Sequence, residues 1–150
     1  MTWTLHGKLI TLVLACGFVP LAAQDKPADP VDQLVAEAQK ADDHQPELYG
    51  KVVRQEVDAA KVAYDSGKTE AAESALTAAA TYSDKLLESA RQHPKHLKRT
   101  EKGLRETARR LQQLERDLEF EQRPPAKAAR EHLEIVDSEL LNLELMGGHK

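Results

Sequence analysis

The fold is decided by residues 95–122, which read KHLKRTEKGLRETARRLQQLERDLEFEQ. Leucine recurs there every seven residues, at the heptad position designated a: Leu97, Leu104, Leu111 and Leu118. The d positions are Thr100, Thr107 and Leu114, so the apolar seam is one-sided. A strict seven-residue repeat keeps one stripe of a helix turned towards a partner helix. The stretch therefore predicts one long helix of a bundle or coiled coil over residues 95–122.

The outer face of this predicted helix is basic. Its b and f positions carry Lys98, Lys102, Arg105, Arg109 and Arg116. Residues 91–110 hold eight basic and two acidic side chains, whereas residues 24–90 hold seven basic and fourteen acidic ones. Such a basic band can bind anionic lipid head groups, a polyanionic envelope polymer or an acidic protein surface. Alternatively, it pairs within the chain with the acidic helices that precede it. For external binding we predict Lys98, Lys102, Arg105 and Arg109 as the contact residues.

The flanking segments predict further helices and no strand. Asp29 and Pro30 make a helix start, as N-cap and first helical residue, for a short helix that fades at residues 42–44. A second helix is predicted from Pro46 to about Ser66 and a third from about Thr69 to the residues before Pro94. A fifth begins at Pro125 and ends at residues 147–148. Because the connections are short, we predict an all-α domain over residues 30–146, either an antiparallel bundle or a short stack of helical hairpins.

Apolar positions indicate which faces pack. The second helix carries two adjacent stripes, which favour contact with more than one neighbour: Leu48, Val52, Ala59, Val62 and Tyr49, Val53, Val57, Ala60, Tyr64. The fifth helix has one seam: Ala126, Ala129, Leu133, Val136, Leu140 and Leu143. Ile135, Leu141 and Leu145 point away from that seam, and we predict that Leu141 and Leu145 either form a contact site or are covered by the first or second helix.

The hairpin over residues 60–79 resembles a tetratricopeptide repeat. The resemblance is carried by Ala60, Tyr64, Gly67, Ala72, Leu76 and Ala79. It spans a single hairpin, and the Trp-Leu-Gly opening and the closing proline of the repeat are absent. Membership of this family would imply a protein-binding scaffold and not an enzyme.

The N-terminal segment predicts export. Residues 1–23 combine a short basic start, an apolar run and small residues before Gln24, which is typical of a cleaved secretory signal peptide followed by a leader over residues 24–29. The alternative is an uncleaved membrane anchor. Cys16 lies in a sequence that resembles a bacterial lipobox, which would instead give a lipid-anchored protein. We expect a periplasmic or extracellular location in either case.

Catalytic chemistry finds no support in the sequence. Cleavage after Ala23 would remove the only cysteine, and no nucleophile turn or phosphate-binding loop is evident. His93 and His96 are separated by Pro94, which disfavours a shared metal. No aromatic residue accompanies the basic band, which argues against nucleic acid. We therefore predict a non-catalytic envelope interaction or scaffold module without cofactor, whose helix faces also permit a homo-oligomer. The alternative is a ligand-binding or sensory bundle.

Overall fold

The computed structural model describes residues 29–95 and 97–147. Within them lie five α-helices and one 3-10 helix: α1 (Pro30–Lys40), α2 (Gln45–Asp65), α3 (Thr69–Gln92), α4 (Leu97–Asp117), η1 (Phe120–Gln122) and α5 (Arg123–Gly147). The predicted signal peptide, Cys16 and the end of the tail lie outside the described residues.

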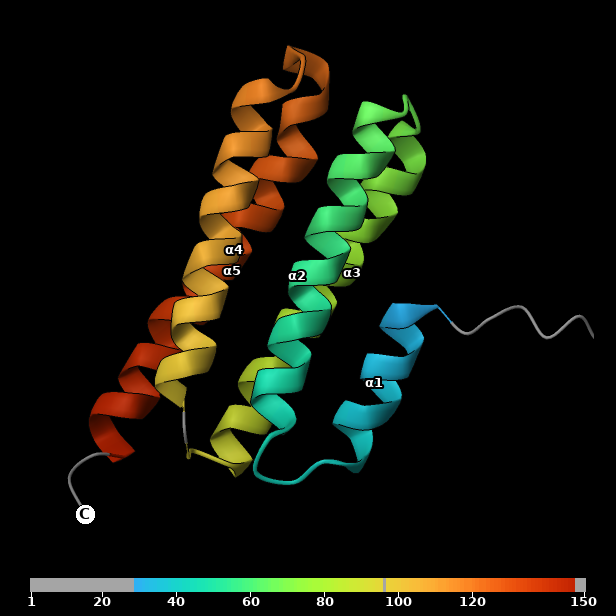
Figure 1. The fold of residues 1–150 in the computed structure, drawn as a ribbon. Helices are drawn as coiled ribbons and strands as arrows, with labels where there is room; N and C mark the ends of the chain where they lie inside the picture. Colours follow the sequence, from blue (N-terminus) through green and yellow to red (C-terminus); the bar gives the residue numbers. More distant parts are fainter. Residues whose placement is uncertain (1–28, 96, 148–150) are drawn as a thin grey trace, which may run out of the picture.

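The four long helices form a closed ring. Each packs against two others, so that α2 contacts α3, α3 contacts α5, α5 contacts α4, and α4 returns to α2. The α2–α3 and α4–α5 turns lie at the same end of the molecule, and α1 lies outside the ring beside α2 (Figure 1). The predicted all-α fold is confirmed, in the form of a helical bundle in which α2 and α4 run parallel.

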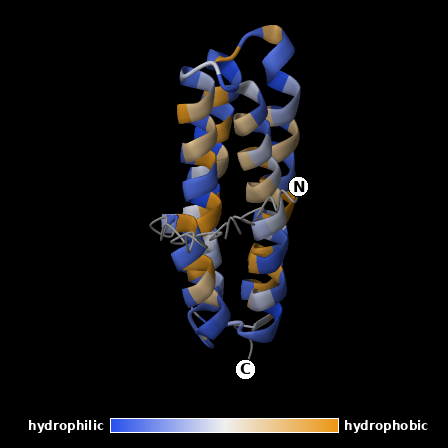
Figure 2. Cartoon of the chain, turned by 90° about the vertical axis from the view of Figure 1, so that its right-hand side faces the viewer, coloured by the Kyte–Doolittle hydropathy of each residue, from blue (hydrophilic) through white to orange (hydrophobic). Residues whose placement is uncertain are grey.

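The leucine seam of α4 forms part of the core. All seven predicted a and d side chains are buried, with at most 8% of each exposed. Buried Thr107 donates its hydroxyl hydrogen bond to the carbonyl oxygen of Gly103, 2.9 Å away, so its polarity is satisfied within the helix. The predicted α5 seam is buried from Ala126 to Leu140, with Leu143 half-buried. Hydrophobic and hydrophilic residues alternate along the helices in Figure 2.

The width of the apolar face of α2 is also explained. α2 packs against α1, α3 and α4, which confirms that it has more than one neighbour. The stripe from Tyr49 to Tyr64 is buried. In the other stripe Val52 is buried but Ala59 and Val62 are exposed, which corrects the prediction for these two. The reason is the shortness of α1, whose first residues lie near Glu56, so that α1 does not cover the positions beyond it.

The helix boundaries require one correction. α4 ends at Asp117, five residues before the predicted end, and the chain turns through η1. α5 begins at Arg123, so Pro124 and Pro125 both lie in its first turn. Proline is tolerated there because the first backbone N–H groups of a helix have no partner within it. The other boundaries agree with the predictions to within a few residues: Asp29 caps α1 through a 3.1 Å hydrogen bond from the Val31 amide, and Gly67 takes a left-handed φ of 71° after α2.

Candidate interaction surface

Part of the basic band pairs with α2. Two ion pairs join the two parallel helices, Arg99 with Glu47 at 3.7 Å and Arg110 with Asp58 at 3.0 Å, and a third, Lys95 with Asp43 at 3.1 Å, joins the segments that precede them. In each pair the cation follows the acid by 52 residues, because parallel helices of the same pitch keep a constant register. This flank of α4 therefore follows the predicted alternative of pairing within the chain.

Lys95 also changes the electrostatics at the start of this seam. Its ammonium donates a hydrogen bond to the Asp43 carboxylate and, with the nearby His93, holds the pKa of that carboxyl below its ordinary value. The Nδ1 atom of His93 lies 3.7 Å from Asp43. The junction between α3 and α4 is thus tied to the segment that precedes α2.

Arg105 is occupied at the contact between α4 and α5. Its guanidinium donates to the Oε1 atom of Glu101, a largely buried residue one turn earlier on α4. Its Nε atom lies 3.4 Å from the Oδ2 atom of Asp137 on α5. Of the four predicted contact residues, Arg105 is therefore the one that the structure engages internally.

The other three predicted contact residues lie on the solvent side of α4. Lys98, Lys102 and Arg109 are exposed, and none forms an ion pair with any residue that the structure describes. They occur at intervals of four and seven residues, so they share one face of the helix. We call Lys98, Lys102 and Arg109 the outer ridge.

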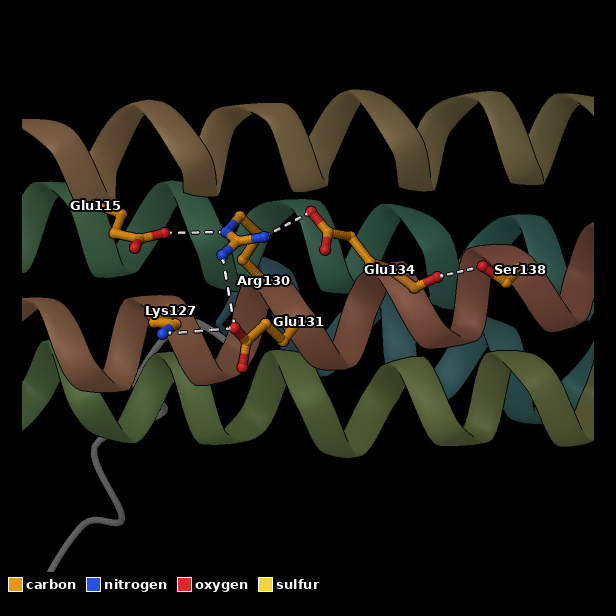
Figure 3. Close-up of polar contacts among 6 residues, drawn as sticks. All are labelled: Glu115, Lys127, Arg130, Glu131, Glu134 and Ser138. Carbon is orange, nitrogen blue, oxygen red and sulfur yellow. Dashed lines mark hydrogen bonds and ion pairs between the residues drawn. The ribbon is translucent and has the colours of Figure 1, made fainter.

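A partly buried arginine fixes the register between α4 and α5. Arg130 of α5 donates to Glu115 of α4 at 2.9 Å and to Glu134 of its own helix at 2.8 Å (Figure 3). Only 16% of its side chain is exposed. The hydrogen bonds to Glu134 and Glu115 raise the pKa of Arg130, so the cation is strongly favoured. Together with the Arg105–Asp137 pair, this contact fixes the position of α5 along the axis of α4.

The C-terminal end of α5 exposes apolar side chains. Leu141 is 39% exposed, Leu145 61% and Met146 71%. α1, one of the helices expected to cover them, packs on α2 instead. Within the described residues, Leu141 and Leu145 therefore form an exposed apolar end, which we define with Met146 as the apolar tip.

A surface groove lies between α2 and α4. It has a cavity volume of about 320 Å³ and opens where Gly50 and Gly103 leave space between the helices. A Cβ atom added at Gly103 would meet no atom within 4 Å. The rim carries four cations and two acids: Lys51, Arg54, Arg99, Lys102, Glu47 and Glu106. The groove is positive, shallow and open to solvent.

Metal chemistry has no obvious place in the described parts of the bundle. Among residues 29–95 and 97–147, no three His, Cys, Asp or Glu side chains are grouped so that they could hold an ion.

None of the described helices is long and apolar enough to cross a membrane. The lipidation predicted at Cys16 falls outside the described residues.

The sequence predicted that the basic band can pair with the acidic helices that precede it, but it did not identify the residues that pair, although a signal was present. Acids at positions 43, 47 and 58 are matched by cations at positions 95, 99 and 110, with one constant separation. The match becomes meaningful only once α2 and α4 are known to be parallel neighbours. Their helices are not consecutive, so short connections gave no reason to compare them.

Comparison of the chain with protein-family models, with curated proteins and with solved structures gave no significant match. The surfaces described above are therefore interpreted from their own geometry and charge.

Proposed function

We propose that this protein is a non-catalytic, exported interaction module of the cell envelope, which binds an anionic surface through its outer ridge. The observation that carries the proposal is the division of the basic band. Arg99 and Arg110 have acids opposite them on α2, Lys95 has an acid in the segment before α2, and Arg105 has acids on α4 and α5. Lys98, Lys102 and Arg109 lack such partners among the described residues and face solvent.

An exposed ridge of like charges favours an external anion for electrostatic reasons. The three cations repel one another and gain no compensating attraction from an ion pair in the described fold. Charges in solution are screened beyond about 8 Å at physiological salt, so distant acidic helices of the same molecule give little compensation. A polyanionic surface in direct contact would supply it and would make the association sensitive to salt. The resemblance of the α2–α3 hairpin to a tetratricopeptide repeat is also compatible with a binding role.

The test compares two double charge reversals on the same helix. Lys102→Glu with Arg109→Glu alters the outer ridge, whereas Arg99→Glu with Arg110→Glu alters the flank that faces α2 and changes the net charge equally. Binding is measured by co-sedimentation with envelope fractions and with anionic vesicles over a range of salt concentrations. We expect the ridge variant to lose salt-sensitive association with nearly unchanged melting. The flank variant should melt earlier and still bind.

Two outcomes would overturn the proposal. A ridge variant that binds as the parent does would show that the ridge is an ordinary solvated face. Equal loss of binding in both variants would show that only net charge matters and that no specific face is used.

Export has its own test. The order of basic, apolar and small residues in residues 1–23 supports a processed N-terminus at Gln24 or a lipidated N-terminus at Cys16. Intact-mass measurement of protein from the native host should give one of these two masses. An unprocessed chain that begins with Met1 in the cytoplasmic fraction would contradict export.

A second candidate function is the binding of a small anionic ligand, favoured by the positive groove at Gly50 and Gly103. Gly103→Leu tests it, because the added side chain has room and removes a glycine that disfavours helix by about 1 kcal/mol. The variant should fold at least as well as the parent and lose a small-molecule ligand detected by thermal shift. It should keep the surface association of the outer ridge.

A further inference from the structure

We infer that the anionic surface bound by the outer ridge is a lipid bilayer, and that the apolar tip of α5 enters its headgroup region. This inference rests on the proposed function and adds the identity of the partner. Two features that are far apart in the sequence carry it: the cations near the start of α4 and the exposed apolar side chains at the end of α5.

The register between α4 and α5 brings these features to one level. Arg105 lies opposite Asp137, and the two helices run in opposite directions. Lys98 lies seven residues before Arg105, which is about 10 Å along the α4 axis. Leu141 and Leu145 lie four and eight residues after Asp137, which is about 6 to 12 Å along α5 in the same direction in space. Figure 1 shows the start of α4 beside the end of α5.

Lys98 and the two leucines of the apolar tip also share one side of the molecule. Lys98 is two turns from Arg105 and so lies on nearly the same face, the flank of α4 that turns towards α5. Leu141 is one turn from Asp137 and therefore lies on the flank of α5 that turns towards α4, and Leu145 is one turn further. The acids near this level are engaged or partly covered, since Glu101 holds Arg105 and Glu144 is half-buried. The side is thus both basic and apolar.

This combination fits a bilayer better than a protein. Peripheral attachment to membranes joins cations that contact anionic headgroups with leucine-like side chains that enter the boundary below them. The apolar tip is too small to form the core of a stable protein interface, which buries about 800 Å² on each partner. Three apolar side chains beside two lysines are sufficient for shallow, reversible insertion.

The experiment places a single fluorescent probe in the tip. Trp3 is the only tryptophan of the sequence and lies in the predicted signal peptide, so Leu145→Trp gives one tryptophan at the predicted depth, with Trp3→Phe added to keep this true of any unprocessed chain. The matched control is Trp3→Phe with Phe120→Trp, because Phe120 is 79% exposed in the α4–α5 turn at the opposite end. Both are mixed with vesicles of phosphatidylglycerol and phosphatidylcholine and with vesicles of phosphatidylcholine alone. We expect a blue shift and quenching by brominated lipid at position 145 only, and only with the anionic vesicles.

A second set of variants separates insertion from attraction. Leu145→Gln with Met146→Gln keeps helix-forming residues and should weaken binding to anionic vesicles at least tenfold. Ile135→Gln, also exposed on α5 but away from the tip, should have no effect. Lys98→Gln with Lys102→Gln should weaken binding about 30-fold, since each cation near an anionic membrane contributes about 1 kcal/mol.

The outcomes distinguish this inference from the proposed function. If Leu145→Gln with Met146→Gln binds anionic vesicles as the parent does and the probe at position 145 stays in water, insertion is wrong while the ridge still binds anions. If neither the parent nor any variant binds vesicles, while the ridge variants lose binding to envelope proteins, the partner is an acidic protein and the bilayer is excluded. If neither ridge nor tip variants change any association, both the inference and the proposed function fail.

Discussion

The two outer seams of α2 differ in charge. Along α4, Glu47 and Asp58 of α2 form ion pairs with Arg99 and Arg110, and the leucines behind these pairs are buried. Along α1, Glu56 of α2 lies near Asp29 and Asp32, so that acids face acids. Of the α1 residues only Ala38 is buried, while Val31, Leu34 and Val35 are half-buried. One seam closes the ring, and the other holds an accessory helix.

The difference indicates how firmly each neighbour is attached. Full burial of a large apolar side chain contributes about 1.5–3 kcal/mol, and α4 contributes several such side chains where α1 contributes none. A hydrogen bond from the Gln45 side chain to the Ala38 carbonyl oxygen, at 3.0 Å, anchors the end of α1. We therefore expect α4 to unfold only with the whole bundle and α1 to detach first.

The largest expected effect comes from a charge placed in the α4 seam. Leu104 and Leu111 are almost fully buried, so Leu104→Asp or Leu111→Asp would bury an unpaired carboxylate. The expected loss of stability is more than about 3 kcal/mol, a large part of the total for a small domain. Thermal unfolding followed by circular dichroism measures it. Melting close to that of the parent would show that this stripe is not core.

A matched pair of truncations compares the two seams directly. Leu111→Ala should cost about 2–5 kcal/mol, because the side chain is fully buried. Leu34→Ala on α1 should cost about 1 kcal/mol or less, because the side chain is only half-buried. Urea unfolding measures both. Equal losses would show that α1 is as integral to the bundle as α4.

A charge exchange tests the attraction across α2 and α4. Arg110→Asp or Asp58→Arg alone should lower stability by about 0.2–1 kcal/mol, since the pair is about half exposed and partly screened. The double variant restores opposite charges and should recover most of the loss. A double-mutant cycle at low and high salt measures the coupling. A double variant less stable than either single one would mean that the ion pair does not join the helices.

The sequence was sufficient for the elements whose signals are local. Heptad leucines predicted the α4 core, and Gly67 predicted the end of α2. The end of α4 was missed because heptad periodicity continues through Leu118, while the chain already turns at that residue. The extent of α1 was predicted, but not the exposure of Ala59 and Val62. That exposure depends on how far α1, a separate helix, extends along α2.

The candidate surface was only partly predictable. The sequence placed Lys98, Lys102, Arg105 and Arg109 on one ridge, and it singled out Leu141 and Leu145 without deciding whether they are exposed or covered by the first or second helix. It did not distinguish Arg105, which the structure engages through Asp137, a residue 32 positions away. It also did not show that the start of the outer ridge lies near the apolar tip. Their proximity follows from the antiparallel register of α4 and α5, which no local pattern specifies.

The smallest expected effect is at the other seam, where Glu56 faces the start of α1. Partial burial, with Asp29 and Asp32 nearby, raises the pKa of Glu56 above its ordinary value of 4.5. A carboxyl whose pKa is higher in the folded state binds more protons when folded, so stability falls as pH rises through that interval. At neutral pH the charged form therefore weakens the docking of α1.

Glu56→Gln removes this penalty while it keeps the size and polarity of the side chain. The variant should melt slightly higher than the parent at pH 7, and the difference should shrink as pH falls and vanish well below pH 4.5, where Glu56 is protonated in both states. Exposed Glu88, which forms no ion pair in the described residues, provides the matched control Glu88→Gln for the removal of one negative charge. Hydrogen exchange of the α1 amides localises the effect, because firmer docking slows exchange in α1 and leaves α4 unchanged. A Glu56→Gln variant that melts lower than the parent at pH 7 would mean that Glu56 holds α1 in place and that the two seams of α2 are alike.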